Sequence, residues 1–301
     1  MSMRIGVDLG GTKTEVIALS NDGSVLFRHR ALTPVGNYEE SIAIIAALVQ
    51  EAEECTGMTG TVGVGTPGAV SPASGLMKNC NSVWLNGQPL AQDLTAALGR
   101  PVRLANDADC FTLSEAVDGA AQGAASVFGV IIGTGTGGGV VLNGQLLNGP
   151  NAIAGEWGHN PMPWPRWDER RGPPCYCGKR GCIETFLSGT GLSRDHYNST
   201  RQRLTATEIA QRCLRGDTMA EQTLARYEDR MARALATVIN VLDPEVIVLG
   251  GGVSNICSLY QRVPKLWGKY VFSDTVATRL LPAKYGDSSG VRGAAWLWPA
   301  E

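Results

Sequence analysis

A chain of 301 residues is long enough to form two domains, each with its own hydrophobic core. Its formal net charge at pH 7 is only −2, so the basic footprint of a nucleic-acid-binding protein is missing. The N-terminal segment has no hydrophobic signal region, and no apolar run reaches the roughly 18 residues that a membrane span needs. The composition therefore predicts a soluble cytoplasmic protein that binds neither nucleic acid nor membrane.

The N-terminal third predicts a three-stranded antiparallel meander followed by alternating helices and strands. Residues 4–9 and 14–19 are apolar strand patterns joined by a glycine turn, and an Asn-Asp-Gly turn leads into a third strand. Apolar residues then recur at helical spacing, and a short strand follows each helical segment. The predicted helices are 39–54, 89–98 and one that opens at Asn106 and runs to about 121, and the predicted strands are 61–65 and 102–105.

The same kinds of element return in the second half of the chain. They are a strand at 127–132, a glycine turn at 133–139, strands at 140–142 and in QLLNG, a long helix at 217–242, and a strand at 246–249 that ends in three glycines. Two copies of one unit predict two similar lobes whose glycine turns point at a shared cleft. Residues 290–298 predict a short apolar helix that packs back across the cleft as a hinge.

Two glycine turns stand at equivalent places in this repeat. Residues 8–13 (DLGGTK) lack the spacing of a Walker A loop, and residues 133–138 (GTGTGG) precede a strand, whereas a dinucleotide fingerprint must open a helix. Each turn alone could be a plain tight hairpin. The pair favours a phosphate site, because glycine N–H groups can approach phosphate oxygens closely and Thr12 and Thr134 add hydroxyl donors. Asp8 could hold a hydrated Mg²⁺ beside a triphosphate.

A predicted strand leads directly into a predicted helix at Asn106-Asp107-Ala108-Asp109. Open α/β sheets bind their ligands at the carboxyl ends of strands. Either Asn106 or Asp107 could simply cap the helix. In the functional alternative, one of the carboxylates is a general base that acts on a hydroxyl group. The residues alone leave both interpretations open.

The segment 151–191 is rich in Pro, Gly and Trp, and it contains a candidate metal site. A disulfide fits badly here, because three neighbouring cysteines are an odd number and a CxC pair is a poor bridge. One imidazole with three thiolates closes a tetrahedral structural zinc site. Glu156 would share a face with the histidine if this stretch is helical. The predicted zinc ligands are His159, Cys175, Cys177 and Cys182.

In this order, the motifs resemble those of the ROK family (repressors, open reading frames and kinases) of sugar kinases. The resemblance covers essentially the whole chain and rests on residues 8–13, Asn106-Asp107, GTGTGG, GEWGH, CxCGxxGCxE and Gly250-Gly251-Gly252. It implies an α/β, two-lobed actin/hexokinase-like (ribonuclease H-like) duplicated fold with a central cleft and a zinc-bound loop. The implied lobes are 1–120 completed by a helix at about 289–301, on the sugar and phosphate side, and 121–288, on the nucleotide side with the zinc loop 151–191.

The resemblance also implies a role for each motif residue. The expected catalytic base is Asp107. The expected sugar-binding residues are Gly68, Asn106, Asp107, Glu156, His159 and Glu184. The expected nucleotide, phosphate and magnesium contacts are Asp8, Gly10, Gly11, Thr12, Lys13, Gly133, Thr134, Gly135, Gly251 and Gly252. The family often has Asn where this chain has Asp109.

The longer stretches GEWGHNPMPW, PCYCGKRGCIETFLSGTGL and GDSSGVRGAAWLW are similar to bacterial fructokinases of the manno(fructo)kinase type. This closer resemblance implies a homodimer that phosphorylates the 6-hydroxyl of fructose with ATP and Mg²⁺. The alternatives are a kinase for N-acetylglucosamine, N-acetylmannosamine, allose, glucose or mannose, a sugar sensor without catalysis, and a sugar-responsive repressor. A repressor would carry a helix-turn-helix domain ahead of the first glycine motif, and we expect none because that motif starts at Asp8.

Overall fold

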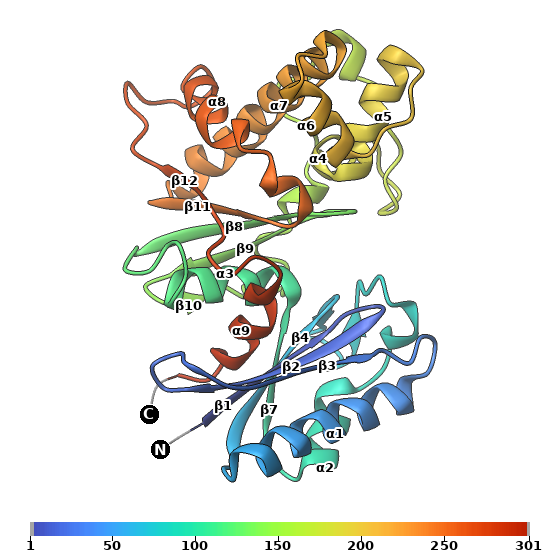
Figure 1. Ribbon diagram of the computed structural model, residues 1–301, viewed down its shortest axis with the longest axis vertical. Helices are drawn as coiled ribbons and strands as arrows, with labels where there is room; N and C mark the ends of the chain where they lie inside the picture. Colours follow the sequence, from blue (N-terminus) through green and yellow to red (C-terminus); the bar gives the residue numbers. More distant parts are fainter. Residues whose placement is uncertain (1–2, 300–301) are drawn as a thin grey trace. The chain divides into compact units, whose positions relative to one another are not determined.

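Two five-stranded sheets organise the chain in the computed structural model, which describes residues 3–299 (Figure 1). The chain divides into two compact units. Unit 1 consists of the residues up to Gly123, Gly139–Ala154 and the C-terminal segment from Asp287. Unit 2 consists of Ala124–Gly138 and Gly155–Gly286. Residues 300–301 of the predicted C-terminal element lie outside the described residues.

The sheet of unit 1 has the strand order β3-β2-β1-β4-β7. Its strands are β1 (Met3–Leu9), β2 (Lys13–Ser20), β3 (Val25–Leu32), β4 (Gly60–Thr66) and β7 (Val102–Asn106). The first three strands pair antiparallel, which confirms the predicted meander, whereas β4 and β7 run parallel to β1. The carboxyl ends of three parallel strands therefore meet at one edge of this sheet, and Asp8 and Asn106 both lie there.

Helices cover both faces of this sheet. They are α1 (Tyr38–Thr56), α2 (Leu90–Leu98), α3 (Asp107–Val117) and α9 (Ser289–Ala295), and the connections hold β5 (Ala69–Val70), β6 (Met77–Lys78), η1 (Val83–Leu85) and η5 (Gly286–Ser288). Asn37 caps α1 by accepting a hydrogen bond from the backbone N–H of Glu40, and the helix ends at Gly57 in the left-handed conformation. Figure 1 shows α1 and α2 on one face and α9 on the other, packed between the sheet and α3.

The second sheet has the order β10-β9-β8-β11-β12. Its strands are β8 (Ser126–Ile132), β9 (Thr136–Leu142), β10 (Gln145–Leu146), β11 (Val246–Gly250) and β12 (Arg279–Pro282). β11 runs parallel to both β8 and β12. The strand predicted in QLLNG is too long, because β10 keeps only two residues before the chain turns at Gly149 and Pro150.

A group of helices completes unit 2, with α4, α5 and α6 beside the long helix α7 (Figure 1). The helices are α4 (Ile183–Leu187), α5 (Gly189–Thr200), α6 (Ala206–Leu214), α7 (Thr218–Leu242) and α8 (Ser258–Trp267), with short 3₁₀ turns η2 (Trp157–His159), η3 (Trp167–Glu169) and η4 (Gly252–Asn255). The long helix was predicted at 217–242, and Asp217 is its N-cap. Among residues 3–299, no helix combines the length and apolarity that crossing a membrane requires.

Candidate active site

The β1–β2 turn carries the first set of predicted residues. The backbone N–H of Gly10 donates to the carbonyl oxygen of Lys13 at 3.0 Å, which closes the turn. Gly11, Thr12 and Lys13 are exposed. The turn therefore lies open to solvent, as an anion-binding loop must, and its contact with phosphate stays a prediction.

Two carboxylates lie near each other in unit 1. Asp8 is half-buried near the end of β1, and Asp107 is exposed at the first position of α3. Burial, with the negative charge of Asp107 as the next cause, raises the pKa of Asp8 from 3.8 to about 7. A divalent cation would relieve this repulsion, and carboxylate oxygens are ligands that Mg²⁺ prefers. The residues present therefore fit a magnesium ion at Asp8.

Asn106 and Asp107 join β7 to α3. The backbone N–H of Ala108 donates to Oδ1 of Asn106 at 2.9 Å and to Oδ1 of Asp107 at 2.8 Å. Both side chains therefore accept a hydrogen bond at the start of the helix, as the capping interpretation predicts. It does not exclude the catalytic interpretation, because Asp107 stays exposed and a capped carboxylate is held in a defined position.

Packing within unit 1 explains Gly68 without a ligand. A Cβ at this position would lie 2.5 Å from the carbonyl oxygen of Lys78 and 2.6 Å from Sγ of Cys80. A cavity of about 260 Å³ lies in the same unit, and Asn106 and Asp109 are among the residues that line it. The predicted sugar residue Asn106 is thus on a cavity wall, whereas Gly68 is buried and does not line this cavity.

In unit 2, the second glycine turn lies beside Glu184. The backbone N–H of Gly133 donates to the carbonyl oxygen of Gly135 at 3.0 Å, and Thr134 is exposed. The backbone N–H of Thr136 donates to Oε2 of Glu184 at 3.0 Å. The structure therefore brings a predicted phosphate turn and a predicted sugar residue together within one unit.

The glycines that follow β11 lie at the same edge of the sheet. Gly250 pairs with Ile131 of β8. Gly251 has φ of 80°, and a Cβ there would lie 2.5 Å from the carbonyl oxygen of Ile132, so this position requires glycine. Gly252 opens η4, and a Cβ at Gly252 would meet nothing within 4 Å. The close approach of Gly251 to β8 brings the predicted adenosine side next to the Gly133 turn.

The four predicted zinc ligands come together. Their ligand atoms all lie within 4.8 Å of one another, with 3.5 Å between Sγ of Cys175 and Nδ1 of His159 and 3.6 Å between Sγ of Cys177 and Sγ of Cys182. Tetrahedral zinc with Zn–S bonds of about 2.3 Å separates its sulfur ligands by about 3.8 Å. The thiols are free, so the disulfide alternative is not adopted. The geometry fits a structural zinc ion.

Tyr176 is a site residue that the sequence analysis missed. Its hydroxyl lies 2.9 Å from Nε2 of His159, and the two rings meet edge to face with centroids 5.0 Å apart. Glu156 and His159 are joined by the 3₁₀ turn η2, so they sit three residues apart on one side of that turn. Tyr176 lies between two cysteines of the motif, but its residue type alone gave no reason to predict a contact with His159.

Comparisons with known proteins agree with this geometry. The ROK family model matches residues 4–301. The N-acetyl-D-glucosamine kinase of Pasteurella multocida is 40% identical over 98% of this chain and 99% of its own length, and that of Photobacterium profundum is 39% identical over the same shares. The structure of a ROK hexokinase from Thermus thermophilus matches with a TM-score of 0.87 and 31% identity, covering 98% of this chain and 97% of that one.

A ROK family glucokinase from Streptomyces griseus, solved with glucose and AMPPNP, matches with a TM-score of 0.80 and 27% identity, covering 98% of both chains. The predicted two-lobed fold and the broader prediction of a ROK-family sugar kinase are confirmed. The predicted subtype is wrong, because the full-length curated relatives at 38–40% identity are N-acetyl-D-glucosamine kinases and not fructokinases. On the family match and these full-length relatives, the chain belongs to the ROK family.

Proposed function

We propose that this protein is an ATP-dependent N-acetyl-D-glucosamine kinase that phosphorylates the 6-hydroxyl of the sugar. The observation that carries the proposal is the full-length similarity, at 38–40% identity, to N-acetyl-D-glucosamine kinases. The 6-hydroxyl is the primary alcohol of the sugar and is therefore its least hindered nucleophile. The geometry of both units supports a phosphoryl transfer, which needs positioning and charge neutralisation more than covalent chemistry.

Asp107 is the general base in this proposal. It lies at the start of α3, where capping of the N–H of Ala108 holds its carboxylate in place. It takes the proton of the sugar hydroxyl as the hydroxyl oxygen attacks the γ-phosphorus of ATP. The bond between the γ-phosphorus and the β–γ bridging oxygen breaks in the same transfer, and ADP leaves. General-base catalysis of this kind contributes typically about 10²–10⁴-fold in rate. Asn106 binds the sugar beside it.

The two glycine turns bind the phosphates of ATP. Residues 10–13 and 133–135 offer backbone N–H groups and the hydroxyls of Thr12 and Thr134, which are exposed in their respective units. A magnesium ion at Asp8 supplies charge neutralisation on the phosphate oxygens when it is bound. Asp8 is suited to hold a cation, because burial and Asp107 raise the pKa of its carboxyl when no cation is present.

The zinc ligands position the sugar-binding side chains of unit 2. His159 faces Cys175 with Nδ1, which leaves Nε2 directed at the hydroxyl of Tyr176. A sugar hydroxyl would take the place of this phenol. Glu184, which follows Cys182 in α4 and accepts from Thr136, binds the sugar from the same side of the loop.

We further propose that residues 1–120 with about 289–301 form the lobe on the sugar and phosphate side, and that residues 121–288 form the lobe on the nucleotide side. The zinc loop 151–191 of the second lobe adds His159 and Glu184 to the sugar contacts. A homodimer stays a prediction, which the molar mass in solution would check.

ADP release from ATP and Mg²⁺ over a panel of hexoses and N-acetylhexosamines tests the substrate. We expect N-acetyl-D-glucosamine to have the highest kcat/KM, with glucose, mannose, fructose and N-acetylmannosamine below it. The Asp107→Asn variant, purified identically, is the matched control for contaminating kinases and should show little turnover on every sugar.

A different sugar at the top of the panel would overturn the substrate while leaving the kinase assignment in place. Binding of N-acetyl-D-glucosamine without turnover would instead favour the sensor without catalysis.

A further inference from the structure

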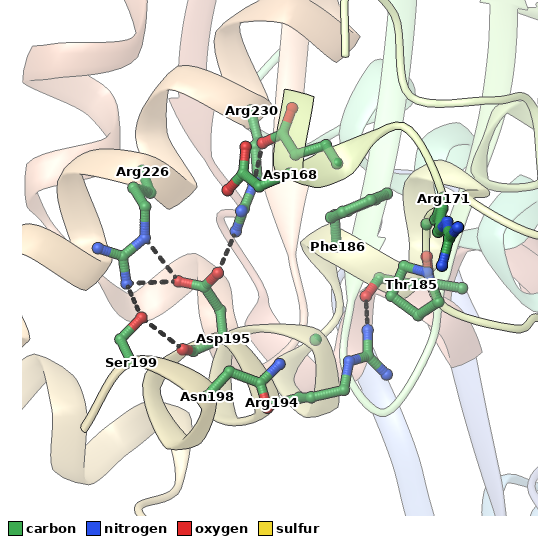
Figure 2. Close-up of a pocket in the computed structure, with 14 residues that line it drawn as sticks. Asp168, Arg171, Thr185, Phe186, Arg194, Asp195, Asn198, Ser199, Arg226 and Arg230 are labelled. Atoms are coloured by element: carbon green, nitrogen blue, oxygen red, sulfur yellow. Dashed lines mark hydrogen bonds and ion pairs between the residues drawn. The ribbon is translucent and has the colours of Figure 1, made fainter. Parts of the chain in front are cut away.

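Unit 2 contains a cavity of about 670 Å³ that none of the predicted site residues lines (Figure 2). It lies between α5, α7 and the segment 168–173. Small-molecule sites typically have volumes of about 300–1,000 Å³. The lining is rich in arginine, which favours a negatively charged ligand.

One wall belongs to a connected network of ion pairs. Its members are Arg166, Arg226, Arg230 and Arg233 with Asp195, Asp229 and Glu169. Four guanidinium groups against three carboxylates leave one positive charge in excess. The network therefore carries a net positive charge.

Arg230 brings unused donors to this wall. Its residue is only 5% exposed, its Nε donates to Glu169 at 2.7 Å, and its Nη1 donates to Asp195 at 2.9 Å. A guanidinium has five N–H donors, and among the described residues Nη2 of Arg230 has no hydrogen-bond partner. A buried cation with spare donors therefore borders the cavity.

Two further arginines stand apart from the network. Figure 2 shows Arg171 and Arg194 on the side of the cavity where Thr185 lies, away from Arg226 and Asp195. Nη2 of Arg194 donates to the carbonyl oxygen of Thr185, and within residues 3–299 neither guanidinium forms an ion pair. Burial lowers the pKa of Arg194, and the positive charge of Arg230 adds to this effect against the opposing charge of Asp195.

The cavity lining has four arginines against the carboxylates of Asp168, Glu169 and Asp195, which leaves one positive charge in excess. We propose that this cavity binds a phosphate group, either as inorganic phosphate or as the phosphomonoester of a sugar. A phosphate anion complements the excess positive charge, and its oxygens suit the forked donors of guanidinium groups. The amide of Asn198, exposed on the same wall, can add a neutral donor.

Occupancy of the cavity would act on the zinc loop. The segment 168–173 lies between the zinc ligands His159 and Cys175, and Thr185 directly follows Glu184. A phosphate between Arg171 and Arg194 would tie that loop to α5. We therefore expect bound phosphate to make the loop more rigid, whatever sugar the protein phosphorylates.

Hydrogen exchange on the full-length protein, followed by mass spectrometry, tests the proposal at the location it names. The probes are inorganic phosphate and N-acetylglucosamine 6-phosphate, with unphosphorylated N-acetylglucosamine and chloride at matched ionic strength as references. Peptides over 168–173 and 191–199 should exchange more slowly with phosphate than with chloride. Arg171→Gln should raise the half-saturating concentration by about tenfold or more, as expected for one lost charge-assisted hydrogen bond.

Arg170→Gln is the matched control. Arg170 is the adjacent exposed arginine, stacked over the ring of Trp167 at 4.9 Å and outside the cavity lining, so this variant should saturate like the wild type. Equal saturation by the two probes would identify free phosphate, and a tenfold preference for the ester would identify a sugar phosphate. Lack of protection with either probe, or equal behaviour of the Arg170 and Arg171 variants, overturns the proposal.

Discussion

Glu169 anchors the zinc-loop segment to α7, and its replacement by Gln should cost about 3–5 kcal/mol of unfolding free energy. The Glu169 side chain is 3% exposed and accepts from Nε of Arg230 at 2.7 Å, and from Nη1 and Nη2 of Arg233 at 2.8 and 2.9 Å. Removing one partner of a buried ion pair typically costs about 3–5 kcal/mol, because the remaining charge stays buried without compensation. The cost should be large here, since the network already has excess positive charge.

The pKa of Glu169 leads to a similar value for the free-energy cost of removing its charge. Burial by itself would raise it, but hydrogen bonds from Arg233, Arg230 and the backbone N–H of Arg166 outweigh burial and lower the pKa from 4.5 to about 2. Such a drop corresponds to about 3 kcal/mol of stability. Because the folded pKa lies below the unfolded one, this contribution is complete above about pH 4.5 and is lost as the pH falls towards 2.

Urea unfolding of wild type and Glu169→Gln at pH 7 and at pH 3 measures both effects. The difference between the two proteins should be near 3–5 kcal/mol at pH 7 and clearly smaller at pH 3. Loss of the predicted zinc at low pH would affect both proteins and would largely cancel in this difference. Asp168→Asn, which changes the neighbouring exposed carboxylate, should stay within about 0.5 kcal/mol of wild type. A cost below about 1 kcal/mol at pH 7, or a cost independent of pH, would refute the reasoning.

Three further changes test the site. Asp107→Asn should lower kcat by about 10²–10⁴-fold with little change in KM for the sugar, as measured by steady-state ADP release, and a kcat within a few fold of wild type would exclude the general base. Purified protein should contain about one zinc per chain by metal analysis, and Cys182→Ser should lower both the zinc content and Tm; metal-free wild type would exclude the zinc site. Gly251→Ala should destabilise by about 1–3 kcal/mol and raise KM for ATP, because its Cβ would lie 2.5 Å from the carbonyl oxygen of Ile132. Gly252→Ala, whose Cβ would meet nothing within 4 Å, is the matched control for stability in urea unfolding.

Elements that carry their own local signals were predictable. The hairpin at residues 4–19 and helix α7 follow from a glycine turn, a regular apolar pattern and a stop at Asp243-Pro244. The missed elements lack such signals. α5 is mostly polar and buries few side chains, α8 contains Pro264, and β12 has only four residues. Their structure depends on contacts with the rest of unit 2.

The wrong substrate has a physical explanation. The stretches that resembled fructokinases include the segment with the predicted zinc ligands and residues 286–298, which contain α9. In α9, Val291, Ala294 and Ala295 are fully buried, and the helix packs on the sheet of unit 1. Side chains that hold a fold together are constrained by packing, so they report the family and carry little information about which sugar the protein binds.

The amino-acid sequence by itself determined the local features of this protein. The predicted zinc ligands, the glycine turns and the strand-to-helix junction at Asp107 depend on residue types at short spacing, and their local geometry is set by neighbours along the chain. Only the tertiary structure decided the features that join distant segments. These are the raised pKa of Asp8, the ion pairs of Glu169 with α7, the requirement for glycine at position 251 and the arginine-rich cavity. Their energies come from burial and charge between residues far apart in sequence, and no local pattern specifies which segments will meet.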